Sequence, residues 1–372
     1  MFRLKTLLVC ALVATVLLFG SLLTSGLADG GANHRRRNTH FGVSGGNVND
    51  ASKAFCCSGT LGALVTNGGT QYVLSNNHVL GRSGAAVIGD DVSQPGLIDN
   101  GCRVSTVVAD FSGAAPLGPS NVDAAVAQLR SGQMDSTGFI EDIGVPSSTT
   151  VNAAVGQSVA KSGRTTGFTT GTVSSINTSV SVQYQQGCNS GKKFTVSYTN
   201  QIVIGPGSFS AGGDSGSLIV TNNGSHNPVG LLYAGSSTTT IANPINEVLA
   251  KLSAALGGSF SFGGGGGGGA LSPAHGNSRE GRQPFIPGVE NLMPILPQQV
   301  SERALAVLEQ HRANIMFTPG VMGVGIGASD KVAGEAAIVI YVNKDADVKG
   351  FIPESIDGIG VSVIYTEQFV AR

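Results

Sequence analysis

Three side chains in the middle of the chain are of the types that perform nucleophilic catalysis. Ser215 lies in the glycine-rich turn SAGGDSGSLIV, which runs into an apolar segment. His78 lies near the end of the β-prone run YVLSNNHVL, and Asp123 begins the apolar run NVDAAVAQL. A serine hydroxyl needs a base within hydrogen-bond reach, and the base needs a third group that fixes its tautomer. These residue types predict a nucleophilic serine served by a histidine and a carboxylate.

Each of the three residues also has a purely structural interpretation. A serine among small residues in a turn is common, and a lone histidine is more often structural than catalytic. His78 is the only one of the six histidines that ends a β run beside an apolar pair. Asp123 has apolar neighbours, and burying its carboxylate costs several kcal/mol unless a hydrogen bond compensates. An imidazole N–H would supply that bond, so the three residues support one another.

The turn around Ser215 also predicts donors for a negatively charged intermediate. Gly213 and Gly216 flank Asp214 and Ser215, and glycine lets the backbone turn tightly and expose N–H groups. The N–H groups of Gly213 and Ser215 are therefore the expected donors of an oxyanion hole.

The cysteines predict disulfides rather than a metal site. Beyond the N-terminal apolar run the chain has four: Cys56, Cys57, Cys102 and Cys188. An even number in an exported chain favours disulfides. Pairing the adjacent cysteines would be strained, so we expect one of them to pair with Cys102 and the other with Cys188. The spacing lacks a CxxC pair, and we expect neither a metal nor a cofactor.

Composition excludes several classes of protein. The chain has 372 residues, a formal net charge of −1 and only 12% charged residues. No clustered basic face is apparent, so we expect no nucleic-acid partner. Tryptophan is absent, and the core must consist mainly of Val, Ile, Leu and Ala.

The N-terminus predicts export. Residues 1–28 have basic residues, then an apolar run and small residues, as a secretory signal peptide does. The alternative is a membrane anchor, but the uninterrupted apolar run is short for a span. We expect a secreted or periplasmic protein without a membrane contact after cleavage. Residues 29–41 form a basic polar arm. The simpler interpretation is a solvated segment, and the alternative is a processing site.

The rest of the chain divides into two folded regions. Residues 42–257 contain many short β-prone runs and end in an amphipathic helix, which predicts a mainly β domain. Residues 258–288 form a flexible linker with seven consecutive glycines. Residues 289–372 read as a helix followed by strands, a small α+β domain of open role. It could bind a substrate or surface, or contact the first domain as a tethered inhibitor.

The segments LSNNHV, VDAAV and GGDSGSL, in this order, resemble the trypsin/chymotrypsin-like serine proteases, nearest to bacterial exported members. The resemblance spans roughly residues 42–257 and implies a chymotrypsin-like double six-stranded β-barrel with a C-terminal helix. It implies that Ser215 is the nucleophile, His78 the general base and acid, and Asp123 the orienting carboxylate.

The same resemblance implies further roles. Asp214 would be buried and support the nucleophile loop. Phe209 would lie at the base of the primary specificity pocket and Gly235 on its wall, which predicts a preference for small or apolar side chains. No IVGG-like start is present, so activation by a new N-terminus inserting beside Asp214 is not expected.

We therefore expect an exported serine endopeptidase that hydrolyses proteins or peptides through an acyl-enzyme intermediate. The alternative is a catalytically silent module of the same fold that binds or adheres. That alternative predicts the loss of a triad residue, and all three are present.

Overall fold

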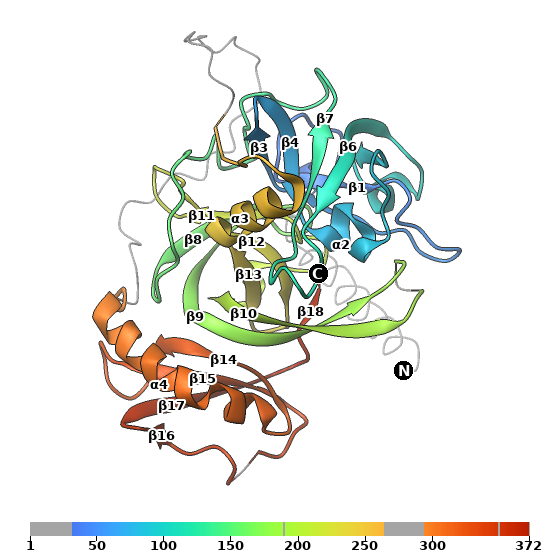
Figure 1. The fold of residues 1–372 in the computed structure, drawn as a ribbon. Coiled ribbons are helices and arrows are strands. Elements are labelled where there is room, and N and C mark those ends of the chain that lie inside the picture. The colour runs from blue at the N-terminus through green and yellow to red at the C-terminus, as the bar shows by residue number, and fades with distance from the viewer. Residues whose placement is uncertain (1–31, 189, 264–293, 349, 372) are drawn as a thin grey trace, which may run out of the picture. The chain divides into compact units, whose positions relative to one another are not determined.

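A computed structural model describes residues 32–188, 190–263, 294–348 and 350–371 (Figure 1). The expected signal peptide and most of the expected linker lie outside the described residues. Among the described helices, none is long and apolar enough to cross a bilayer.

The first sheet closes on itself through a single bent segment. Its antiparallel order is β2-β1-β5-β6-β7-β4-β3, so β2 and β3 lie at opposite edges. Only Gly62 separates β2 from β3, and one continuous segment therefore contributes to both edges. A Cβ at Gly62 would lie 1.8 Å from the carbonyl oxygen of Gly216, so the bend requires glycine. The strands are β1 Val43–Asn47, β2 Gly59–Leu61, β3 Ala63–Asn67, β4 Thr70–Ser75, β5 Asp91–Gln94, β6 Thr106–Ala114 and β7 Ala125–Leu129.

The next six strands form a second closed barrel. Each pairs antiparallel with two neighbours in the circuit β8-β9-β10-β13-β12-β11-β8. They are β8 Ser158–Gly163, β9 Gly167–Gln185, β10 Lys193–Gly205, β11 Leu218–Thr221, β12 Pro228–Gly235 and β13 Thr240–Pro244. Helix α3, Ile245–Leu256, follows and buries Ile245, Val248 and Leu252 in the core of the first barrel. The expected double six-stranded β-barrel with a terminal helix is confirmed.

The C-terminal part has the expected helix-then-strands order. Helix α4, Gln298–Phe317, packs Ala304 and Leu308 against an apolar cluster that includes β14 and β15. The strands are β14 Val321–Ala328, β15 Ala336–Asn343, β16 Ser355–Ile356, β17 Ile359–Thr366 and β18 Val370–Ala371. Strand β14 pairs antiparallel with β9, so these strands continue the sheet of the second barrel.

Short helices complete the described part of the chain. Helix α2 covers Asn77–Leu80, directly after β4. The 3-10 helices are η1 Asn33–Arg35, η2 Arg82–Gly84, η3 Leu97–Asn100 and η4 Gly207–Phe209.

The basic arm is held to the first barrel rather than solvated throughout. His34 is buried; Nδ1 lies 2.8 Å from the Gly42 carbonyl oxygen and Nε2 lies 3.1 Å from Oδ2 of Asp142. Burial of His34 opposes protonation, but these contacts outweigh it and raise the pKa of His34.

Candidate active site

Both barrels contribute to the candidate active site. His78 lies on α2 after β4, and Asp123 lies just before β7, so both come from the first barrel. Ser215 lies in the turn before β11 of the second barrel. Its carbonyl oxygen accepts a 2.8 Å hydrogen bond from the N–H of Thr60, which joins the turn at Ser215 to β2 of the first sheet.

His78 and Asp123 form a tightly coupled pair. His78 Nδ1 lies 2.6 Å from Asp123 Oδ2, and the His78 backbone N–H donates to Oδ1 at 3.2 Å. The Asp123 carboxylate is fully buried, whereas the His78 side chain is 14% exposed. Because an ionised carboxylate can only accept, the proton on this side of the ring belongs to Nδ1. Nε2 is then the basic nitrogen, as a general base requires.

Three further residues hold Asp123, and sequence reasoning missed all of them. Tyr184 donates its hydroxyl to Oδ2 at 2.9 Å. Asn243 accepts the Asp123 backbone N–H at 2.9 Å, and Asn76 donates to the Asp123 carbonyl oxygen at 2.7 Å. Only Asn76 had a local signal, because it lies two residues before His78. The other two come from the second barrel.

Tyr184 belongs to a buried group of tyrosines. Its hydroxyl lies 2.7 Å from that of Tyr198, and the ring of Tyr198 packs edge-on against Tyr233 at 5.1 Å between centroids. Burial, together with the charge of Asp123, raises the pKa of Tyr184 well above its ordinary value. Tyr184 therefore stays protonated and acts as a hydrogen-bond donor to the carboxylate.

Ser215 is fully buried, and its hydroxyl is directed to a backbone carbonyl. Oγ donates a 3.2 Å hydrogen bond to the carbonyl oxygen of Tyr233 on β12. Transfer of this proton to His78 requires the hydroxyl to turn away from that carbonyl. Hydrogen bonds between catalytic groups are often formed only when substrate binds.

The turn at Gly213 has a backbone conformation that favours glycine. Gly213 has a φ of +97°, and a Cβ there would lie 2.6 Å from both Arg164 and Thr165 side-chain atoms, so only glycine fits. Within the described ranges, the N–H groups of Gly213 and Ser215 donate to no protein acceptor. They are therefore available to an oxyanion, although this role stays a prediction.

Asp214 is buried beneath this turn and pairs with a buried lysine. Its carboxylate accepts hydrogen bonds from the N–H groups of Thr165 at 2.8 Å and Ala211 at 2.9 Å. Lys161 Nζ lies 3.6 Å from Oδ2, with both side chains fully buried. Burial lowers the pKa of Lys161 to about 8, while the charge of Asp214 opposes that shift. Sequence reasoning missed Lys161, which supplies a buried cation beside Asp214 in the loop that carries Ser215.

Phe209 and Gly235, the two expected specificity residues, lie in different surroundings. Phe209 is 1% exposed and packs in an apolar cluster with Val173, Ile204 and Leu232. Gly235 ends β12 and pairs with Thr240 on β13. A pocket role for Phe209 and Gly235 stays a prediction.

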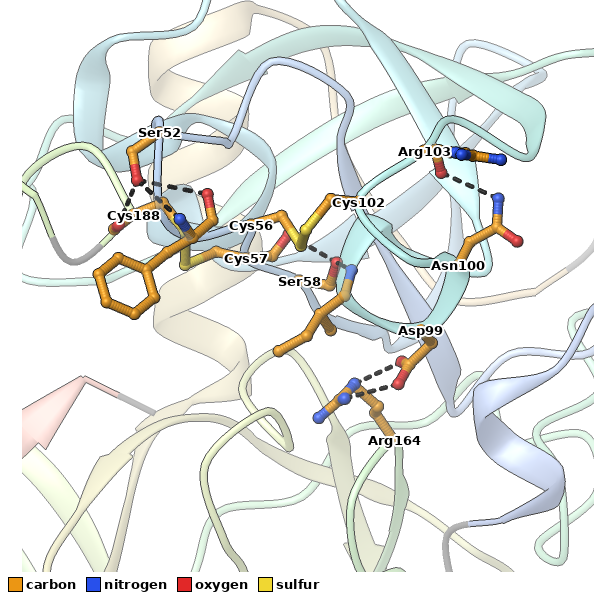
Figure 2. The surroundings of a disulfide bond; sticks show 12 residues. Ser52, Cys56, Cys57, Ser58, Asp99, Asn100, Cys102, Arg103, Arg164 and Cys188 are labelled. Atoms are coloured by element: carbon orange, nitrogen blue, oxygen red, sulfur yellow. Dashed lines mark hydrogen bonds and ion pairs between the residues drawn. A yellow bond between two sulfur atoms is a disulfide. The ribbon is translucent and has the colours of Figure 1, made fainter.

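The four cysteines form two disulfides (Figure 2). Cys56 pairs with Cys102, and Cys57 pairs with Cys188, an arrangement within the expected set. The second bond joins a loop of the first barrel to the turn between β9 and β10. Within the described residues, no group of three or more His, Cys, Asp and Glu side chains is placed to hold a metal ion.

A buried ion pair between Arg164 and Asp99 also joins the two barrels. Arg164 contacts Asp99 through two 2.6 Å hydrogen bonds, and both side chains are about nine-tenths buried (Figure 2). A bidentate pair of this kind fixes orientation as well as position. It orients the segment that carries Thr165, a backbone donor to Asp214.

Comparison with protein families gives one match. Residues 120–243 match the family described as the Nal1 C-terminal domain, a range that contains Asp123 and Ser215 but not His78. No curated protein matches the chain.

Several solved structures are similar to part of the chain. A glutamic acid specific serine protease is 23% identical, with 60% of this chain and 98% of that chain covered and a TM-score of 0.41. Thermobifida fusca Protease A is 20% identical, with 60% and 99% covered and a TM-score of 0.39. Nocardiopsis Protease is 19% identical, with 55% and 92% covered and a TM-score of 0.38.

Proposed function

We propose that the protein is a serine endopeptidase that cleaves peptide bonds through an acyl-enzyme on Ser215. The observation that carries the proposal is the 2.6 Å contact between His78 Nδ1 and the fully buried Asp123 carboxylate. A buried carboxylate that also accepts the Tyr184 hydroxyl is held in one orientation, and it fixes the imidazole tautomer that a general base needs.

The proposed reaction has two halves. In the first, Ser215 Oγ attacks the peptide carbonyl while His78 Nε2 takes its proton, and Asp123 stabilises the resulting imidazolium. The N–H groups of Gly213 and Ser215 stabilise the oxyanion, and His78 then protonates the leaving amine. In the second half, His78 removes a proton from water, which attacks the acyl-enzyme carbonyl. His78 then gives this proton to Ser215 Oγ as the bond to the acyl group breaks, which releases the acid and restores both side chains.

Substrate preference and export are part of the proposal. Proteases of the resembled family that cleave after basic side chains have an acidic residue at the position that Phe209 holds here. An apolar residue at this position supports cleavage after small or apolar side chains. The two disulfides support an oxidising compartment. The apolar segment within residues 1–28 supports export. We propose a secreted or periplasmic location for the folded region 42–257.

The test is hydrolysis of a mixed peptide library by the full chain and by Ser215→Ala and His78→Ala variants. We expect both variants to lose nearly all activity and cleavage to follow small or apolar residues. A serine in an exposed turn, Ser225, gives the matched control Ser225→Ala, which should keep full activity. A folded protein that neither hydrolyses peptides nor reacts with a small fluorophosphonate at Ser215 would support the silent binding module. Equal activity of Ser215→Ala and the parent would exclude the mechanism.

A further inference from the structure

The last described residues of the chain lie along the edge of β12 (Figure 1). Strand β18 pairs antiparallel with β12, with Val370 opposite Gly235 and Ala371 opposite Ala234. It also pairs in parallel with β9, and the N–H of Gln183 donates a 2.9 Å hydrogen bond to the Phe369 carbonyl oxygen. The segment is therefore bound as a strand between β12 and β9.

This edge of β12 leads directly to the nucleophile. The residue before Ala234 is Tyr233, whose carbonyl oxygen accepts the Ser215 hydroxyl. Because β18 is antiparallel to β12, its chain direction runs from Gly235 toward Tyr233. Extended peptides commonly bind by adding a strand to a sheet edge. In a substrate, the residues before the scissile bond must run from N to C toward Ser215. The direction of β18 is thus the direction that a substrate needs.

Side chains before β18 anchor the segment. The Thr366 hydroxyl donates to Oγ of Ser236 at 2.6 Å and lies 2.7 Å from that of Thr238. Lys344 binds the Glu367 carboxylate at 3.0 Å, which ties the segment to β15 and its following turn.

Phe369 makes the deepest contact of the segment. Its side chain is fully buried, and its ring packs edge-on against Tyr341 at 5.8 Å between centroids. Its apolar cluster also contains Tyr184 and Tyr233, which contact Asp123 and Ser215. Burial of a phenylalanine side chain is strongly favourable, so Phe369 is the main anchor of the segment.

We propose that residues 366–371 act as a built-in competitor that occupies the substrate-binding edge of this peptidase. The proposal rests on the proposed function. The edges of β12 and β9 that pair with the segment cannot pair with a substrate strand at the same time. A tethered competitor has an effective concentration in the millimolar range, so even weak intrinsic binding keeps the edge occupied. Full activity then requires displacement of the segment.

The experiment uses two covalent probes of different reach on the full chain. A small fluorophosphonate needs only a reactive Ser215, whereas a peptidyl phosphonate must also occupy the β12 edge. We expect Phe369→Ala to react roughly tenfold faster than the parent with the peptidyl probe, with little change for the small probe. The control Phe317→Ala removes an 85% exposed phenylalanine and should react as the parent does.

Two further measurements distinguish release of the segment from misfolding of Phe369→Ala. Thr366→Val keeps the shape of the side chain but removes its two hydroxyl contacts, and it should also accelerate the peptidyl probe. The free peptide TEQFVA, added to the released variant, should raise KM for a peptide substrate and leave kcat unchanged.

The outcomes separate this proposal from the proposed function. If the small probe labels all variants but the peptidyl probe reacts equally with parent, Phe369→Ala and Thr366→Val, the competitor is excluded and the peptidase remains. If neither probe labels any folded variant, both proposals fail.

Discussion

Tyr184 donates a 2.9 Å hydrogen bond to Oδ2 of Asp123, the same oxygen that lies 2.6 Å from Nδ1 of His78. The carboxylate is thus fixed from two sides, by one residue of each barrel. Tyr184 sits on β9, which also pairs with β14 and β18. The strand that supports the proposed catalytic pair therefore also carries the C-terminal strands.

Removing the Tyr184 hydroxyl should weaken catalysis without abolishing it. A hydrogen bond to a charged group contributes about 1.5–3 kcal/mol, so Tyr184→Phe should lower kcat by roughly tenfold or more. KM should change little, because the substitution removes only a hydroxyl that contacts Asp123 and Tyr198 and leaves the backbone edges of β9 and β12 unchanged. Steady-state kinetics on a peptide substrate measures the two constants separately. Tyr341→Phe, whose hydroxyl lies 2.8 Å from that of Ser175, is the control and should keep kcat.

Replacing Lys161 should destabilise the turn that carries Ser215. Lys161→Met leaves the Asp214 carboxylate buried without its cation, and breaking a buried pair costs about 3–5 kcal/mol. Urea unfolding should show that loss, and activity should fall because Asp214 anchors the turn before Ser215. Lys331→Met is the matched control: Lys331 is 59% exposed and 4.0 Å from Glu354, so its loss should change stability by less than about 1 kcal/mol. Equal stability of the two variants would contradict this account.

Asp50 should make stability depend on pH. Burial raises the pKa of Asp50 to about 6 from 3.8, although Arg82 and His78 oppose the shift. The folded state thus binds the Asp50 proton more tightly than the unfolded state. This contribution to stability is present below about pH 4 and is lost as pH rises toward 6.

Asp50→Asn tests that dependence directly. A difference of about two pKa units corresponds to about 3 kcal/mol, so the variant should be more stable than the parent at pH 7. At pH 4 the two should differ little, because the parent carboxyl is then protonated when folded. Urea unfolding at both values measures the difference. The measured quantity is the difference in unfolding free energy between Asp50→Asn and the parent. If the variant gained no stability over the parent between pH 4 and pH 7, the assigned pKa shift would be excluded.

The Cys57–Cys188 disulfide should stabilise the contact between the barrels. It closes a loop with a sequence separation of 131 residues, for which loop-closure entropy predicts about 5 kcal/mol. The double variant Cys57→Ser, Cys188→Ser should unfold at lower urea concentration than Cys56→Ser, Cys102→Ser, whose separation is 46 residues. The reverse order would show that strain or residual structure outweighs loop length.

Much of the barrel architecture could be predicted, because alternating strands and turn residues are local signals. The expected runs GTVSSI and SVSVQY proved to be one strand, β9, which spans Gly167–Gln185 and has a positive φ at Asn177. Its pairing with β14 could not be predicted, since edge pairing between distant segments leaves no periodic pattern.

Within the candidate site, the sequence identified the reactive residue types and Asp214, but not the other supporting residues. His78, Asp123 and Ser215 carry local motifs. A lysine in a strand is normally predicted to be exposed. Lys161 is buried because Asp214, from another segment, provides its counter-charge, and the sequence alone does not show that contact. Tyr184 lies 61 residues beyond Asp123 and becomes a neighbour only when the barrels pack.

Covalent labelling of the full chain by a small fluorophosphonate, with the modified residue located by mass spectrometry, tests the central claim most directly. We predict one adduct per chain, on Ser215, which disappears in Ser215→Ala and forms far more slowly in His78→Ala. A folded chain that gains no adduct, or an adduct that persists in Ser215→Ala, would contradict the assignment of Ser215 as the nucleophile.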